Sequence, residues 1–374
     1  MAKILILANN DVGLYKFRKE LIESFLGEGH EVYISLPDGN YVEKLCHMGC
    51  VFSETLIDRR GTNPITDLKL IIYYKTLIKN IKPDIVLTYT IKPNVYGGIA
   101  CKATNTPYLA NVTGLGTSIE NGGVLQKTTL ALYATGLKKA SCVFFQNETN
   151  RHFFLDKHIV TGKTKLIPGS GVNLKYHRFE DYPDSDDIIK FLFIGRIMRN
   201  KGIDELLEAA QRIKNMYPNV RFDLVGDCEE NYAERLLDLE NRGIITYYGQ
   251  QDDVHSFLKG AHAIVLPSYH EGMANVLLEA ASSGRPVIAS NIPGCRETFD
   301  EGVTGYGFEV RNTEALVNTI EKFIRLPYDE KKQMGISGRA KIEREFDRQM
   351  VIDSYMEEIN RILYMYKRKA GAES

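Results

Sequence analysis

The sequence predicts an α/β protein with two doubly wound, Rossmann-like domains. Short apolar runs of strand length alternate with amphipathic helical stretches, which is the order expected of βαβ units around parallel sheets. The 374 residues exceed the usual span of one hydrophobic core, so we expect one domain at 1–172 and a second at 173–354. Two strand–loop–helix units in the second half carry charged residues directly after a strand, where open α/β sheets bind ligands.

The first half opens as a βαβ unit. We expect a strand at residues 3–8, a loop at 9–17, a helix at 18–29 and a strand at 30–36. This unit lacks G-x-G-x-x-G, which disfavours a nicotinamide site. Further elements follow in the same alternation: helices at 65–81, 96–104 and 122–139, and strands at 84–89, 107–112 and 141–146.

A hinge is expected at Gly169-Ser170-Gly171, directly after Pro168. The acidic run at 180–187 contains an Asp-x-Asp pattern, but it lies in a proline-containing linker with no strand before it. We interpret this run as a solvated loop. The second half then continues with strands at 191–194, 221–225, 245–248, 263–267 and 287–290, and with helices at 204–216, 314–324 and across most of 340–369.

The most informative stretch is residues 268–280, which follows an apolar run closed by Pro267. The chain turns at Glu271-Gly272 and enters a helix, a geometry that directs backbone N–H groups and a positive helix end toward an anion. Glu271 lies in the turn, and Glu279 lies about two helical turns further on. Taken alone, each carboxylate would be read as a helix cap or a solvated side chain.

A second strand–loop–helix unit lies about seventy residues earlier in the sequence. The strand at 191–194 ends at Gly195, and Arg196 and Lys201 follow it. Two cations at the carboxyl end of one strand, together with the carboxylates of Glu271 and Glu279, suit a sugar nucleotide with a diphosphate.

These motifs resemble those of the retaining glycosyltransferases of family 4. Glu271 and Glu279, with seven residues between them, match the E-x7-E element, and Gly195-Arg196 with Lys201-Gly202 matches the diphosphate-binding element. The stretch 165–173 is similar to the interdomain signature. The resemblance runs over nearly the whole chain, most closely to the bacterial branch that builds capsule, O-antigen and lipid-linked glycans. It implies the GT-B fold, with the two domains facing across a cleft and a last helix, about 355–374, packing back on the first domain.

The resemblance also implies roles for single residues. Arg196 and Lys201 would neutralise the departing diphosphate, and Glu271 would face the donor sugar, as the catalytic residues. The implied nucleotide-sugar site comprises Gly13, Gly195, Gly226, Val254, Gly272, Met273, Ala274, Asn275 and Glu279, and the implied acceptor site comprises Lys16, Arg18, Thr113 and Gly114. Many family members have a histidine where this chain has Thr113, and a proline where it has Ala274. The resemblance implies retention of configuration without a metal or other cofactor.

Net charge and its distribution along the chain limit the classes of partner that we expect. The net charge of −1 gives no support for nucleic-acid binding. Residues before Val172 carry an excess of lysine and arginine, which fits either an anionic lipid surface or an ordinary solvated surface. The helices at 65–81 and 122–139 combine apolar and basic residues, so each either packs on a sheet or lies on a membrane.

No stretch has the length or pattern of a signal peptide or a membrane span, and the six cysteines read as reduced thiols. We therefore expect a cytoplasmic location, with contact to the inner face of the plasma membrane left open. The expected partners are a nucleotide sugar, with UDP as the nucleotide, and a glycan or lipid-linked acceptor. Two alternatives remain open: a UDP-sugar 2-epimerase of GT-B fold and a non-catalytic sugar-nucleotide-binding subunit.

Overall fold

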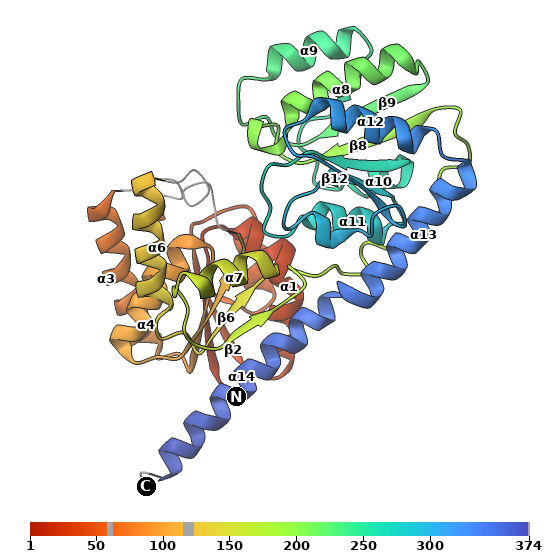
Figure 1. Ribbon diagram of the computed structural model, residues 1–374. Coiled ribbons are helices and arrows are strands. Elements are labelled where there is room, and N and C mark those ends of the chain that lie inside the picture. Colours follow the sequence, from red (N-terminus) through yellow and green to blue (C-terminus); the bar gives the residue numbers. More distant parts are fainter. Residues whose placement is uncertain (58–62, 115–122, 373–374) are drawn as a thin grey trace. The chain divides into compact units, whose positions relative to one another are not determined.

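The computed structural model of the chain contains two compact units (Figure 1). Unit 1 comprises Met1–Ser170 and Gln349–Ser374, and unit 2 comprises Gly171–Arg348. The domain boundary that we expect after residue 172 lies next to the division at Ser170. The last helix, which we expect to return at about residue 355, begins at Arg348 and belongs to unit 1 from Gln349 onward.

The structure describes residues 1–57, 63–114 and 123–372, without the side chains of Val124, Leu125 and residues 367–372. None of the helices within these ranges is long and apolar enough to cross a membrane.

Unit 1 is built on a parallel sheet with the strand order β3-β2-β1-β4-β5-β6-β7. Successive side chains of a strand point to opposite faces, so the sheet divides the core into two layers. Ile4 and Ile6 pack with helices α1, α2 and α14, whereas Leu5 and Leu7 pack with the helices on the other face. The strands are β1 Lys3–Leu7, β2 Glu31–Leu36, β3 Val51–Glu54, β4 Ile85–Tyr89, β5 Tyr108–Val112, β6 Cys142–Phe145 and β7 Thr164–Leu166.

The helices of unit 1 cover both faces of this sheet (Figure 1). Asn10 caps α1 through its side-chain oxygen, and Asn63 caps α3 in the same way, with Pro64 in the first turn. The helices are α1 Asp11–Gly27, α2 Val42–His47, α3 Pro64–Ile81, the π-helix η1 Pro93–Gly97, α4 Gly98–Thr104, α6 Gly123–Leu137, α7 Glu148–Asp156 and α14 Arg348–Ala372.

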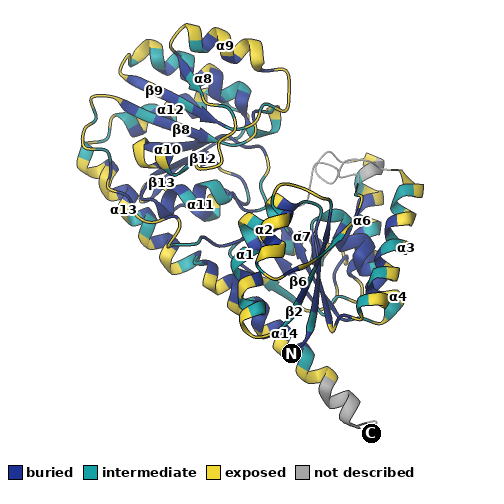
Figure 2. Ribbon diagram, turned by 180° about the vertical axis from the view of Figure 1, so that it is seen from behind, coloured by how far each residue is buried: buried dark blue, intermediate teal, exposed yellow. Residues whose placement is uncertain are grey.

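Unit 2 repeats the architecture with a parallel sheet in the order β10-β9-β8-β11-β12-β13. Figure 2 shows the central strands of both sheets as buried and the outer faces of the helices as exposed. The strands are β8 Ile189–Ile194, β9 Val220–Val225, β10 Ile245–Tyr247, β11 Ala263–Leu266, β12 Val287–Ser290 and β13 Gly305–Phe308. The helices are η2 Arg199–Lys201, α8 Ile203–Met216, α9 Ala233–Asn241, α10 His255–Gly260, α11 Asn275–Ser282, η3 Arg296–Thr298, α12 Thr313–Ile324 and α13 Tyr328–Glu345.

The strand order of each sheet reverses at one point. In unit 1 the reversal lies between β1 and β4, and in unit 2 it lies between β8 and β11. At such a switch point the loops after the two strands diverge to opposite faces, so a crevice opens at the carboxyl ends of the strands. The two charged motifs that the sequence singles out follow β8 and β11, so both lie at the switch point of unit 2.

The structure corrects two local expectations. The loop expected at 9–17 is wrong, because α1 begins at Asp11 once Asn10 has capped it. The sequence also fails to predict β3, β7 and β13. In β13, Gly305 reads as a strand breaker, but a Cβ there would lie 2.2 Å from the carbonyl oxygen of Val287, so the close approach of β12 requires glycine.

Candidate functional site at the switch point of unit 2

The loop after β8 is held against the end of β11 by close backbone contact. Gly202 has a φ of +71°, and a Cβ at this position would lie 2.1 Å from the carbonyl oxygen of Pro267. Tyr269 donates its backbone N–H to the carbonyl oxygen of Asn200 at 3.0 Å. The residues that follow the two switch-point strands are therefore fixed relative to one another by main-chain geometry.

This geometry brings Lys201 and Glu271 together. The ammonium nitrogen of Lys201 lies 2.5 Å from Oε1 of Glu271, and both side chains are largely buried, with 20% and 14% of their surfaces exposed. A lysine and a glutamate at the carboxyl edge of the sheet thus form one pair, although seventy positions separate them in the sequence. The pair offers a cation and a carboxylate to any ligand in the crevice.

Arg196 lies at the same edge and has a different partner. Its Nη1 lies 3.1 Å from Oε1 and 3.0 Å from Oε2 of Glu229, which follows β9. About half of the Arg196 side chain is exposed, in contrast to Lys201. The two cations expected to contact a diphosphate are therefore each paired with a carboxylate from a neighbouring loop.

The loop after β12 packs against the backbone of the turn at Glu271-Gly272. Gly294 has a φ of +85°, and a Cβ there would lie 2.7 Å from the carbonyl oxygen of Glu271. The N–H of Ala274 donates to Gly294, and that of Asn275 donates to Met273. These two N–H groups are therefore engaged in hydrogen bonds within the fold.

Two residues near this turn, His270 and Cys295, have pKa values that are shifted by their surroundings. Burial lowers the pKa of His270, as does the nearby charge of Arg311, while Glu271 opposes the change. Cys295, beneath the turn, is fully buried, and burial followed by the charge of Glu271 holds the pKa of its thiol well above the ordinary value. His270 is therefore favoured as neutral imidazole beside the site, and Cys295 as an unreactive thiol.

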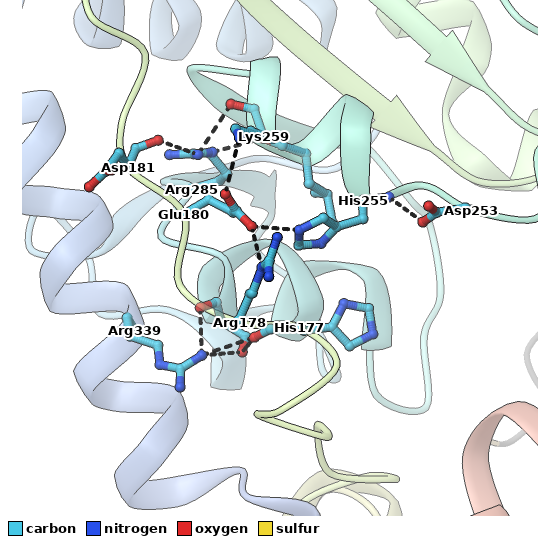
Figure 3. Close-up of polar contacts among 11 residues, drawn as sticks. His177, Arg178, Glu180, Asp181, Asp253, His255, Lys259, Arg285 and Arg339 are labelled. Carbon is cyan, nitrogen blue, oxygen red and sulfur yellow. Dashed lines mark hydrogen bonds and ion pairs between the residues drawn. The ribbon is translucent and has the colours of Figure 1, made fainter.

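Glu279 lies in α11, where the sequence places it, and is partly buried. Its Oε1 lies 3.8 Å from Nε2 of His177, a buried residue of the segment that leads into unit 2. The backbone oxygen of His177 accepts hydrogen bonds from Arg339 and Ser282 (Figure 3). The carboxylate expected to hold a ribose therefore lies near the imidazole of His177, whose backbone is tied to α11 and α13.

Val254, which the sequence places beside a nucleobase, directly precedes the short helix α10. Figure 3 shows how buried charges hold this helix. At its start, Nε2 of His255 lies 2.6 Å from Oε1 of Glu180. At its end, the fully buried Arg285 donates to the carbonyl oxygens of Leu258 and Lys259, and burial lowers the pKa of this guanidinium to about 10.

Glu180 and its neighbours correct one expectation. We expect the run at 180–187 to be a solvated loop, but Glu180 is buried and also accepts a hydrogen bond from Arg178. Lys331, likewise buried, pairs with Asp186 at 2.5 Å. Glu180 and Asp186 are therefore held by partners within unit 2. The rest of the acidic residues in this run, Asp181, Asp184 and Asp187, are exposed as expected.

Gly226 has a structural reason to be glycine. Gly226 has a φ of +150°, and a Cβ there would lie 1.8 Å from the carbonyl oxygen of Gly195. The loops after β8 and β9 therefore run in direct backbone contact. This contact, rather than an approach to a ligand, is what the structure assigns to Gly226.

Three of the candidate residues of unit 1 lie in helix α1 and not in a loop. Gly13 and Lys16 are in α1, where a Cβ on Gly13 would lie 2.8 Å from the capping oxygen of Asn10. Lys16 is exposed, with its ammonium 5.9 Å from the ring centre of Tyr41. Arg18 is buried within α1, and its guanidinium lies 5.1 Å from the ring centre of Tyr89.

Thr113 and Gly114 follow β5 at the carboxyl edge of the sheet of unit 1, and both are half-buried. The rest of the expected glycine-rich turn, residues 115–117, lies outside the described residues. The structure therefore places two of the four expected acceptor residues at the sheet edge and two within α1.

The sequence reasoning missed Glu229 and His177 as neighbours of the site. Glu229 belongs to an acidic run, Asp227-Cys228-Glu229-Glu230, directly after a strand, and this position was a usable signal. His177 lies in a linker, and no local pattern connects it to Glu279.

Comparisons with known proteins agree with this geometry. Residues 3–147 match the model of the family "Glycosyl transferase 4-like", and residues 178–341 match that of "Glycosyl transferases group 1". The chain is 27% identical to the N,N'-diacetylbacillosaminyl-diphospho-undecaprenol alpha-1,3-N-acetylgalactosaminyltransferase of Campylobacter jejuni, over 96% of this chain and 99% of that protein.

A second relative is the UDP-Gal:alpha-D-GlcNAc-diphosphoundecaprenol alpha-1,3-galactosyltransferase of Escherichia coli, 27% identical over 70% of this chain and 71% of that protein. Among solved structures, Anabaena HepE in complex with UDP and glucose has a TM-score of 0.78 at 19% identity, covering 96% of this chain and 100% of that chain. This last likeness shows a shared fold.

Proposed function

Because the chain belongs to the family 4 glycosyltransferases of GT-B fold, we propose that it moves a hexose or N-acetylhexosamine from a UDP-sugar to a hydroxyl of a lipid-linked glycan. The observation that carries this proposal is the pairing of Lys201 with Glu271 at the switch point of unit 2. A cation for the diphosphate and a carboxylate for the attached sugar are the two groups that such a donor needs, and here they are in contact.

The chemistry follows from charge. When the glycosidic bond to the diphosphate breaks, negative charge develops on the leaving group and positive charge develops on the sugar ring. Arg196 and Lys201 stabilise the negative charge on the leaving group, and the carboxylate of Glu271 positions the sugar ring that carries the positive charge. Fixed charges that face the developing charge contribute more to the rate than groups that must reorganise.

We propose that transfer retains the anomeric configuration and proceeds without a metal. Two side-chain cations at one sheet edge supply the neutralisation that a divalent ion supplies elsewhere. The UDP assignment draws support from the names of the Escherichia coli relative and of the HepE complex, both of which contain UDP. Glu279 would then hold the ribose hydroxyls, and the backbone around Val254 would flank uracil.

We propose a lipid-linked acceptor because the names of both relatives specify a diphospho-undecaprenol or diphosphoundecaprenol substrate. Helix α3 offers a surface suited to the membrane that holds such a molecule. Ile65, Leu68 and Ile72 recur on one face of it and are 67%, 58% and 57% exposed. Lys69, Lys75 and Lys79 are exposed on the same helix, and such a combination favours an anionic lipid surface. We call these six residues the α3 face.

A UDP-release assay tests the proposed reaction. The purified chain is incubated with UDP-hexoses and UDP-N-acetylhexosamines, with and without polyprenyl-diphosphate sugars. We expect UDP release that depends on the acceptor, and a product linkage with the anomeric configuration of the donor by NMR. Conversion of the donor to a free 2-epimer would support the epimerase instead, and tight UDP binding without turnover on any acceptor would support a binding subunit.

Sedimentation with anionic vesicles tests the α3 face. We expect binding at low salt that weakens as salt rises, and its loss in the double variant Leu68→Glu and Ile72→Glu. Val303, a 56% exposed residue of unit 2, provides the control Val303→Glu. Equal sedimentation of the wild type and both variants would contradict a role for this face.

A further inference from the structure

The loop after β9 runs beside the loop after β8 beyond the ends of both strands. Ile197 donates its N–H to the carbonyl oxygen of Asp227 at 2.7 Å, and Glu229 donates its N–H to that of Ile197 at 3.2 Å. Ile197 and Cys228 form a parallel bridge. The backbone hydrogen bonds between the two strands therefore continue past the sheet edge. They place the side chain of Glu229 next to that of Arg196.

The contact between these two side chains uses only one end of the guanidinium. Both carboxylate oxygens of Glu229 accept from Nη1 of Arg196, at 3.0 and 3.1 Å. An arginine carries five N–H donors in a planar fork, so Nε and Nη2 retain donors for a second group. A diphosphate prefers such a fork, because two parallel N–H donors match two phosphate oxygens.

We propose that Glu229 is the positioning residue of Arg196: it holds one end of the guanidinium so that the other end faces the diphosphate of the donor. This inference rests on the proposed function. The side chain of Arg196 is half-exposed, and an unrestrained arginine at the surface samples many rotamers. Lys201 does not require a positioning residue from this loop, since its side chain is largely buried and already pairs with Glu271.

The ion pair itself contributes little to the stability of the fold, because exposed pairs are screened by water. The neighbouring acid Glu230 acts differently, because its side chain accepts the backbone N–H of Arg199. Of the two adjacent glutamates, one therefore shapes the loop and the other orients a cation. This division separates a structural role from a positioning role.

The test compares transfer rate with UDP affinity in Glu229→Ala. We expect kcat to fall by about tenfold to a hundredfold, because a misplaced donor loses much of its effect on the transition state. We expect the Kd for UDP not to weaken, because the change also removes a negative charge beside the diphosphate. Glu229→Gln, which keeps an oxygen acceptor, should retain more activity than Glu229→Ala.

A double-mutant cycle with Arg196→Ala completes the test. If Glu229 acts through Arg196, adding Glu229→Ala to Arg196→Ala should cause no further loss of kcat. The matched control is Glu314→Ala, which removes the exposed ion pair between Arg212 and Glu314 elsewhere in unit 2 and should leave kcat unchanged.

Three results would overturn the inference alone: an unchanged kcat in Glu229→Ala, the same fractional loss with and without Arg196, or loss of UDP binding together with kcat. A wild-type chain that binds UDP but transfers no sugar refutes the proposed function, and the positioning role is refuted with it.

Discussion

The switch points of the two units contain similar ion pairs in different settings. In unit 2, Lys201 follows the switch-point strand β8 and pairs with Glu271, while in unit 1 Lys92 follows β4 and pairs with Asp67 at 2.7 Å. The side chains of Lys92 and Asp67 are 14% and 15% exposed, close to the values of the unit 2 pair. Distance and burial alone therefore do not distinguish the two.

Their hydrogen bonds do distinguish them. The second oxygen of Asp67 accepts the hydroxyl of Tyr96, so both oxygens are used to tie α3 to the turn after β4. Within the described residues, Glu271 uses only Oε1, and a second cation, Arg196, lies at the same edge. A satisfied pair holds a fold together, whereas a pair with remaining capacity beside a second cation can bind a ligand.

The largest effect is expected at Lys201. Lys201→Ala should lower kcat by about a hundredfold or more, since it removes a charge that faces the leaving diphosphate. The melting temperature should also fall, because the variant leaves the mostly buried carboxylate of Glu271 without its cation. Steady-state transfer kinetics with scanning calorimetry check both statements. A variant with normal kcat would remove Lys201 from the site.

Close backbone contacts should matter in both units. Gly226→Ala and Gly98→Ala each place a Cβ within 2.0 Å of a carbonyl oxygen, of Gly195 and of Gly136 respectively. Each should destabilise its unit by more than about 2 kcal/mol, because backbone atoms cannot move aside as a flexible side chain can. Denaturant unfolding measures this. Among molecules that remain folded, only Gly226→Ala should also impair UDP binding, since it displaces the loop of Arg196.

Lys92→Ala should lower stability, as Lys201→Ala does, but should leave the ligand site intact. Removal of this lysine leaves Asp67 with an unbalanced, mostly buried charge, which costs about 1–3 kcal/mol of unfolding free energy. Affinity for UDP should remain that of the wild type. If instead Lys92→Ala abolished UDP binding and left stability intact, the distinction between the two pairs would be lost.

A moderate effect of pH on unit 2 is expected from His262. Its Nδ1 accepts the N–H of Lys190 and its Nε2 lies 3.0 Å from the carbonyl oxygen of Ser185, so the neutral ring fits the site. Burial lowers the pKa of His262 from its ordinary value of 6.5. The unfolded chain then binds the proton more readily, and stability should fall as the pH drops from 6.5 toward the lowered value, by at most about 1.4 kcal/mol per pH unit. Urea unfolding of wild type and His262→Gln should show a shallower pH dependence in the variant.

The smallest effect is expected from metal removal. Dialysis against EDTA should leave transfer activity essentially unchanged if Arg196 and Lys201 neutralise the leaving group on their own. Loss of activity that manganese or magnesium restores would contradict this.

Much of the site could be predicted from the sequence. Strand, loop and helix patterns located Arg196, Lys201, Glu271 and Glu279, because residues after the strands of a parallel sheet share one edge. Two surroundings that the sequence does not reveal depend on contacts between distant segments. Arg18 is buried under Tyr89, and Gly226 is glycine because of the carbonyl of Gly195, which no local pattern encodes.

The same limit applies to the acidic residues. Glu180 lies in a run that the sequence predicts to be solvated, yet it is buried, and Glu229 pairs with a cation of the site that no local pattern names. Burial of a charge is decided by the partner that tertiary packing supplies, and that partner is far away in the sequence. By contrast, Lys201 and Glu271 each stand in a motif of their own, so their pairing could be expected.

Calorimetric titration of UDP into the wild type, the double variant Arg196→Ala and Lys201→Ala, and Lys92→Ala compares the two switch points in one experiment. We predict that UDP binds the wild type and Lys92→Ala equally and binds the double variant at least about a hundredfold more weakly, because two charge-assisted contacts are lost. Equal affinity for the wild type and the double variant would contradict the claim that the cations of unit 2 hold the diphosphate.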